Sequence, residues 1–295
     1  MEVLIIKLGA SGDVVRTTPL LRRLGTNASW LTSSKNTPLL EGLEGGIPKQ
    51  VLPWELRDAL LGQSFDLVVN LEDDLETARF AASVRSKRLF GAYATDDGDV
   101  HYTRDAQAWF DLSLISARGR READRLKLEN RCSYQELIFG GLGLQFDGEE
   151  YLLPATQKGS LEGDVAVAPE AGPVWPMKNW AYYEWLVQEV RTRGWTVNVL
   201  PLRPTLLEHL ADIRQHRCVV SGDSLPMHLA IGSHVPCVAL FTCTSPWEIH
   251  DYPHLTKLVS SELSRHFYSR EFDPHATTAI PKEHVLDAVL NALNQ

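Results

Sequence analysis

Cysteine is scarce in this 295-residue chain, and its four cysteines show no C-x-x-C spacing. Cys132, Cys218, Cys237 and Cys243 are therefore expected to be free thiols rather than zinc ligands or partners in structural disulfides. No apolar run approaches the roughly 20 residues that a membrane-spanning helix needs, and the short apolar run at the start contains a lysine. These absences predict a cytoplasmic globular protein.

Basic residues are also few: the chain has 29 lysines and arginines and 38 acidic residues, which gives a formal net charge of −9. A general nucleic-acid or anionic-membrane binder needs a basic face that recruits phosphates, so this balance argues against both classes. The basic run "RGRREADRLK" at 118–127 is interpreted as a solvated helix face. At most, the protein is expected to touch a membrane peripherally.

Strand-like and helix-like segments alternate along the chain, which is typical of parallel sheets covered by helices. Strands are expected at 3–7, 29–33, 66–72 and 87–93, and again in "DVAVAPEAG", "WTVNVLP", "RCVVSGDS" and "PCVALFT". Helices are expected at 104–144, 179–194 and 284–293. Because the turn-rich stretch 146–163 separates the two series, the sequence predicts two doubly wound α/β domains, 1–155 and 156–295.

The first expected strand ends in a glycine turn, "KLGASGDVV". A dinucleotide-binding oxidoreductase would need a third glycine where Val14 or Val15 stands, and an acidic residue after the second strand, where "SWLTSSKNT" has none. The oxidoreductase interpretation is therefore disfavoured. The turn instead brings backbone near a ligand and carries Asp13, which is either a helix N-cap or a catalytic carboxylate.

Two stretches of the second half have the features of an anion site. "GDSLPMHL" begins at the end of an expected strand and continues into a helix, and exposed amides at such a helix start bind a diphosphate with the help of the helix dipole. "PEAGPVWPMKNW" presents Lys178 beside the next helix, where its charge would neutralise phosphate. Asp223 has helix capping as its alternative role, and His228 has a buried structural role as its alternative.

In order and spacing these stretches resemble glycosyltransferase family 9, the ADP-heptose:lipopolysaccharide heptosyltransferases. "IIKLGASGDVVRTTPLL" resembles that family's K-x-x-x-x-GD-x-x-x-x-x-P opening, and "PEAGPVWPMKNW" resembles its P-G-x…K-x-W segment. "GDSLPMHLAIGSHVPCVALFTCTSP" is similar to its D-[ST]-G-x-x-H-L-A-A…P-x-[IV]-A-L-[FY]-G-x-T-x-P signature. The resemblance spans nearly the whole chain and implies a GT-B fold, in which two Rossmann-like domains face a central cleft.

The resemblance implies an inverting, metal-independent glycosyltransferase that needs no cofactor and moves a sugar, with heptose from ADP-heptose favoured, to an acceptor hydroxyl. The first domain would bind the acceptor, with Asp13 as general base, and the second would bind the nucleotide sugar. The residues implied on the donor side are Lys178, Gly222, Asp223, Ser224, Leu225, Pro226 and His228, and the acceptor-side loop consists of Gly9, Ala10, Ser11 and Gly12.

Departures from the family pattern keep alternatives open. Leu225 and Thr242 stand where the family generally has glycine, and Asn179 stands where it is often basic. A leucine disfavours a positive φ and crowds the approach of backbone to phosphate. The alternatives are a catalytically relaxed nucleotide-sugar-binding protein and a transferase with another nucleoside diphosphate sugar. The acceptor is open among a glycan or glycolipid, a small metabolite and a protein hydroxyl.

Two acidic turns have competing interpretations. Asp97-Gly98-Asp99 is a D-x-D triplet, which a metal-dependent GT-A transferase would use to hold a cation, but a glycine turn after a strand in an acidic chain favours a solvated loop. Glu72, Asp73 and Asp74 form an acidic turn after another expected strand. That turn is interpreted as exposed, with binding of an acceptor hydroxyl as the alternative.

Overall fold

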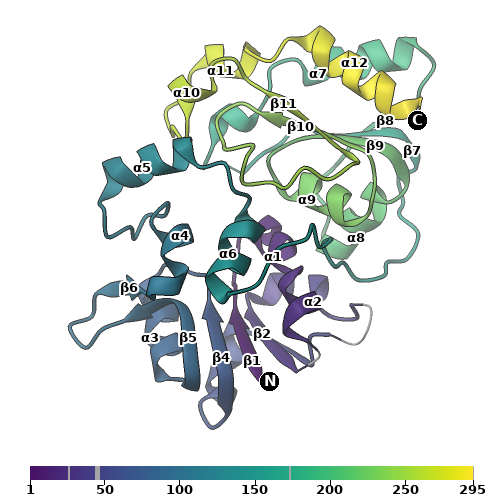
Figure 1. The fold of residues 1–295 in the computed structure, drawn as a ribbon. Helices are drawn as coiled ribbons and strands as arrows, with labels where there is room; N and C mark the ends of the chain where they lie inside the picture. The colour runs from purple at the N-terminus through teal and green to yellow at the C-terminus, as the bar shows by residue number, and fades with distance from the viewer. Residues whose placement is uncertain (26, 44–46, 173, 295) are drawn as a thin grey trace. The chain divides into compact units, whose positions relative to one another are not determined.

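The computed structural model describes residues 1–25, 27–43, 47–172 and 174–294. The chain divides into two compact units, Met1–Ala155 (unit 1) and Thr156–Gln295 (unit 2). Each unit has its own sheet with helices on both faces (Figure 1). Among the described residues, no helix has the length and apolar character to cross a membrane.

Unit 1 is built on a six-stranded sheet with the order β3-β2-β1-β4-β5-β6. The first five of these strands pair in parallel, and β6 pairs antiparallel with β5. The central strand has every side chain buried, as expected for a parallel strand covered on both faces. The strands are β1 (Val3–Ile6), β2 (Ala28–Thr32), β3 (Gln50–Pro53), β4 (Ser64–Asn70), β5 (Arg85–Ala94) and β6 (Val100–Tyr102).

Two apolar cores cover the faces of this sheet. On one face, Val3 and Ile5 pack with residues of α1, α2, α4 and α6, and on the other, Leu4 and Ile6 pack with Phe80 of α3 and Leu60 of η3. The helices and 3-10 turns of unit 1 are α1 (Ser11–Thr17), α2 (Leu20–Leu24), η1 (Ser34–Leu39), η3 (Trp54–Leu60), α3 (Leu75–Ser83), η4 (Arg104–Ala106), α4 (Gln107–Phe110), α5 (Arg120–Glu129) and α6 (Tyr134–Leu142).

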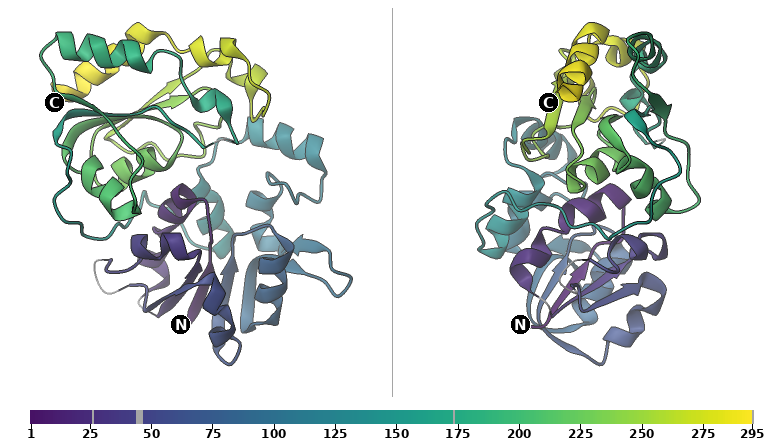
Figure 2. Two further views of the ribbon diagram at one scale, coloured as in Figure 1. Left: turned by 180° about the vertical axis from the view of Figure 1, so that it is seen from behind. Right: turned by 90° about the vertical axis from the view of Figure 1, so that its right-hand side faces the viewer.

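Unit 2 has a fully parallel five-stranded sheet with the order β11-β10-β9-β7-β8. Helices α7 and α12 cover one face, while α8 and α9 cover the other (Figures 1 and 2). The elements are β7 (Gly163–Ala168), η5 (Pro176–Lys178), α7 (Tyr183–Thr192), β8 (Val197–Val199), α8 (Leu206–Ile213), β9 (His216–Gly222), α9 (Leu225–Gly232), β10 (Cys237–Phe241), β11 (Leu255–Val259), α10 (Leu263–His266), α11 (Pro274–Thr278) and α12 (Lys282–Leu293).

All eight expected strands are confirmed, with ends that differ by a few residues. The single long helix expected at 104–144 is wrong, because that stretch breaks into η4, α4, α5 and α6. Gly119, with a φ of 81°, ends one segment before α5, and Ser133 caps α6 by a reciprocal bond with Glu136. Strands β3, β6 and β11 and helix α8 were not expected, and the three strands have no fully buried side chain.

Candidate functional site

Asp13 lies in the first turn of α1, whose N-cap is Ala10, so the capping interpretation is wrong. Its carboxylate instead meets two cations: Oδ1 lies 3.0 Å from Nε of Arg16, and Oδ2 lies 3.9 Å from Nζ of Lys7. One third of the Asp13 side chain (33%) is exposed, whereas both cations are buried. The carboxylate is therefore fixed in orientation and still accessible to a ligand.

Glu72 is the second carboxylate at Lys7, and its Oε1 lies 3.0 Å from the Lys7 ammonium. The same oxygen accepts hydrogen bonds from the backbone N–H groups of Leu8 (2.5 Å) and Gly9 (3.2 Å). Only 15% of the Glu72 side chain is exposed, so its interpretation as part of an exposed turn is wrong. Burial lowers the pKa of Lys7, but the charges of Glu72 and Asp13 outweigh it and the pKa is raised.

The guanidinium of Arg16 is held by aromatic rings as well as by Asp13. Its Cζ lies 4.2 Å from the ring centroid of Tyr134 and 5.6 Å from that of Trp109, within the range of cation–π attraction. The Tyr134 hydroxyl shares a hydrogen bond of 2.8 Å with that of Thr17. These contacts join α1 to α4 and α6, so the partner of Asp13 has little freedom to move.

The acceptor-side loop, Gly9 to Gly12, follows β1 and continues into the first two residues of α1, and it is held from two directions. Glu72 binds the N–H of Gly9 on one side, and on the other the Ser11 hydroxyl donates to the side-chain oxygen of Asn36 at 2.7 Å. The amide of Asn36 in turn donates to the carbonyl of Leu8 at 2.7 Å. This loop and Asp13 therefore lie together at the carboxyl end of β1, the edge at which parallel α/β sheets bind ligands.

In unit 2, Lys178 and Asp223 form the centre of the second candidate site. The Lys178 ammonium donates to the backbone carbonyl of Asp223 and to its carboxylate, the latter at 3.2 Å. Helix α9 follows directly with Ser224 as its N-cap, so the capping interpretation of Asp223 is wrong. Its carboxylate instead holds Lys178 beside the helix start, and the two side chains are only 13% and 17% exposed.

The segment that carries Lys178 is anchored by close backbone packing and by polar contacts. A Cβ atom on Gly222 would lie 3.1 Å from the carbonyl oxygen of Lys178, a tight contact that would require the neighbouring backbone to shift by a few tenths of an ångström. The Thr242 hydroxyl donates to the carbonyl of Met177 at 2.6 Å, and Asn179 accepts from the N–H of Ala171 at 2.9 Å. Thr242 and Asn179, two departures from the family pattern, therefore both anchor this segment.

The remaining donor-side residues lie in the first turns of α9. Leu225 is the first residue of the helix and does not have a positive φ, so the leucine causes no strain in place of the family's glycine. Pro226 is buried in the first turn. His228 is 3% exposed, and its Nε2 lies 4.0 Å from Asp223 Oδ1. The histidine is thus buried, as its structural interpretation expected, and lies close to Asp223.

Sequence reasoning did not single out Thr244 and Ser245, which follow β10. Both residues are 2% exposed, and their hydroxyl oxygens have no hydrogen-bond partner among the described residues. Buried hydroxyls are normally paired, so these two are candidates for contact with a ligand. The signal in the sequence was the T-x-P of the family signature, in which Thr244 occupies the threonine position.

The D-x-D triplet lies in the hairpin turn between β5 and β6. The N–H of Thr95 donates to the carbonyl of Asp99, and the N–H of Gly98 donates to that of Thr95. Gly98 has a φ of 86°, which glycine adopts readily. Within the described ranges of the chain, no three histidine, cysteine, aspartate or glutamate side chains are arranged to hold a metal ion.

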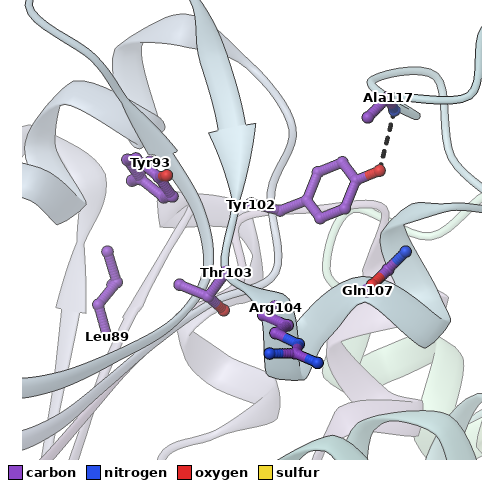
Figure 3. A pocket seen from close by; sticks show the side chains of 7 residues that line it. All are labelled: Leu89, Tyr93, Tyr102, Thr103, Arg104, Gln107 and Ala117. Atoms are coloured by element: carbon purple, nitrogen blue, oxygen red, sulfur yellow. Dashed lines mark hydrogen bonds between the residues drawn. The ribbon is translucent and has the colours of Figure 1, made fainter.

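Unit 1 also contains an open hollow of about 710 Å³ beside β5, β6 and α4 (Figure 3). The Tyr102 hydroxyl accepts from the N–H of Ala117 at 2.8 Å and donates to Asp111 at 2.6 Å, which fixes its ring. Arg104 makes no hydrogen bond or ion pair through its side chain with any residue that the structure describes. The hollow is lined by Leu89, Tyr93, Tyr102, Thr103, Arg104, Gln107 and Ala117.

Residues 177–273, which contain Lys178, the start of α9 and the buried hydroxyls, match a family model described as glycosyltransferase family 9 (heptosyltransferase). This segment of the chain is similar to glycosyltransferase family 9. The resemblance seen in the sequence motifs is thereby confirmed, and with it the assignment as a glycosyltransferase. No curated protein sequence matches the chain.

Solved structures share the fold of this chain over its full length. The family 9 glycosyltransferase from Veillonella parvula superposes with a TM-score of 0.66 at 15% identity, covering 99% of this chain and 97% of its own. The E. coli ADP-heptose LPS heptosyltransferase II gives 0.63 at 16%, covering 100% and 99%. The E. coli heptosyltransferase WaaC with ADP gives 0.59 at 15%, covering 99% and 100%. The expected GT-B fold is therefore confirmed.

Proposed function

We propose that this chain is an inverting glycosyltransferase that moves a sugar from a nucleoside diphosphate donor to an acceptor hydroxyl, without a metal or cofactor. ADP-heptose is the favoured donor, because one similar E. coli structure is named as an ADP-heptose heptosyltransferase and another is solved with ADP. The observation that carries the proposal is the lysine held at the start of α9 within the segment that matches the family.

On the donor side, the start of α9 and Lys178 would bind the diphosphate. An ammonium group has three N–H donors, and the bonds to Asp223 use two of them, which leaves one for a phosphate oxygen. The backbone N–H of Leu225, the first residue of α9, and the helix dipole would add further stabilisation of negative charge, whereas Pro226 has no N–H and those of Met227 and His228 bond to the carbonyl of Ser224. These groups would stabilise the diphosphate as it leaves with the electron pair of the broken glycosidic bond.

On the acceptor side, Asp13 would take the proton of the attacking hydroxyl as its oxygen bonds to the anomeric carbon. The role needs a carboxylate that is ionised, accessible and fixed in position. Asp13 is one-third exposed and contacts Arg16 and Lys7, which favour its charged form by Coulomb attraction. Its place at the carboxyl end of β1 supports the same role.

The experiment that tests the base is Asp13→Asn, which keeps the shape of the side chain and removes its basicity. Release of ADP from ADP-heptose, measured with acceptor-containing extract, should fall by about 10²–10⁴-fold while ADP affinity is unchanged. Asp58→Asn, an exposed carboxylate on η3, is the matched control and should keep full activity. Normal turnover by Asp13→Asn would contradict the base assignment. ADP binding without turnover by the wild type would favour the relaxed binding protein.

For the acceptor, we favour a glycan over a small metabolite or a protein hydroxyl, and place part of it in the hollow beside α4. Tyrosine rings stack on sugar C–H faces, and the Arg104 guanidinium is suited to an anionic substituent. Helix α4 links this hollow to Asp13, since Trp109 contacts Arg16 while Gln107 lines the hollow. In the same assay Arg104→Met should raise the KM for the acceptor and leave that for the donor unchanged. An unchanged acceptor KM would reject this placement.

A further inference from the structure

Glu72 brings three separate groups of unit 1 to one carboxylate. Its Oε1 accepts from two consecutive backbone N–H groups, those of Leu8 and Gly9, and also contacts the Lys7 ammonium. All three partners lie between β1 and the helix that carries Asp13, whereas Glu72 itself follows β4. A buried carboxylate with this many donors fixes the path of the loop, because any displacement would leave charged and polar groups unpaired.

Lys7 transmits this arrangement to Asp13. Its ammonium touches both carboxylates, at 3.0 Å from Glu72 and 3.9 Å from Asp13, and only 9% of its side chain is exposed. The other groups facing these charges are Arg16, which contacts Asp13, and the phenol of Tyr134, whose pKa is raised chiefly by burial. With Glu72 ionised, two carboxylates share the two cations, so the positive field acting on Asp13 is partly cancelled.

We propose that Glu72 is a positioning residue of this glycosyltransferase, which fixes the loop before Asp13 and offsets the charge of Lys7 so that Asp13 stays basic. The inference rests on the proposed role of Asp13 as base. It differs from the interpretation of Glu72 as an acceptor ligand, because the observed partners of its carboxylate belong to the protein.

The test is Glu72→Gln, because the glutamine oxygen can still accept from both N–H groups while the charge is lost. The uncompensated Lys7 ammonium should then favour the ionised form of Asp13 and make it a weaker base. The two carboxylates contact the same Lys7 ammonium, at 3.0 Å for Glu72 and 3.9 Å for Asp13. Coulomb interaction at the dielectric of a partly exposed site therefore predicts that the acid limb of the pH–kcat/KM profile moves down by about one pH unit. The rate on the plateau should fall at the same time.

Two further variants make the outcome decisive. Asp73→Asn changes the neighbouring carboxylate, which makes no hydrogen bond or ion pair among the residues described here, and should leave the acid limb at its wild-type pH. The double variant Lys7→Met/Glu72→Gln removes both charges, so neither the ammonium nor the carboxylate is left buried without its counter-charge. The acid limb of its pH–kcat/KM profile should lie at a higher pH than that of Glu72→Gln. The double variant also serves if Glu72→Gln does not fold.

A purely structural role would lower activity at every pH without moving the acid limb, and that result would overturn the proposal. Asp13→Asn, measured in parallel, tests the role of Asp13 as base separately from the positioning role of Glu72. Loss of activity in Asp13→Asn combined with an unmoved limb in Glu72→Gln would reject only the positioning role. Full activity in Asp13→Asn would reject both the base and the positioning role.

Discussion

The hydrogen bond from Thr242 to the carbonyl of Met177 gives a sharp prediction about the donor side. It is a buried bond of 2.6 Å, and Thr242 is fully buried, so Thr242→Val keeps the shape of the side chain and leaves the carbonyl without its donor. An unpaired buried polar group costs about 1–3 kcal/mol. At about 2–4 °C per kcal/mol for a domain of this size, the melting temperature of unit 2 should fall by about 2–12 °C.

The same substitution should weaken binding of ADP, because the carbonyl belongs to the residue before Lys178 and the bond ties that segment to the end of β10. Thr242→Ser keeps the hydroxyl and is the matched control, so it should melt near the wild type and bind ADP with similar affinity. Differential scanning fluorimetry with and without ADP measures both effects. If Thr242→Val has the melting temperature of the wild type and ADP raises it by the same amount, this bond does not anchor the Lys178 segment.

Two further predictions concern titration and thiol reactivity. Burial raises the pKa of Asp111, but hydrogen bonds from Tyr102 and Arg118 outweigh it and the pKa is lowered. A lowered folded-state pKa adds stability above the ordinary carboxyl value that is lost as pH falls through the folded-state value, so the gap in melting temperature between wild type and Asp111→Asn should close below about pH 4. A gap that is constant with pH would contradict this. Ellman's reagent should label Cys132 alone in the native protein, since the other three cysteines are buried and burial raises the pKa of Cys218 to about 12. Rapid labelling of a second thiol would show that a core opens.

The fold was predictable from the sequence where most side chains of a strand are buried. β1, β4, β9 and β10 appear as apolar runs bounded by turn residues, because a parallel strand covered on both faces needs apolar side chains at nearly every position. β3 and β11 lie at sheet edges and are only half-buried, so they lack that signal. Their pairing depends on neighbours that are remote in sequence.

The candidate site was predictable in its residues but not in their partners. Asp13, Lys178 and the start of α9 stand in motifs that can be read from consecutive positions. The contacts of Glu72 with Lys7 and Leu8 join positions 65 and 64 residues apart, respectively, and no local pattern encodes such a pairing. Local propensity also misled, because aspartate is a preferred N-cap and both Asp13 and Asp223 were given that alternative.

The departures from the family pattern bear on whether the donor side is intact. A leucine at position 225 would have disrupted the helix start if that residue needed a positive φ, but Leu225 has an ordinary helical conformation. Thr242, which stands in place of the family's glycine, donates its hydroxyl to the carbonyl of Met177. Both substitutions are therefore accommodated by the surrounding backbone. They change how the segment carrying Lys178 is anchored, and they leave the lysine and the helix start together.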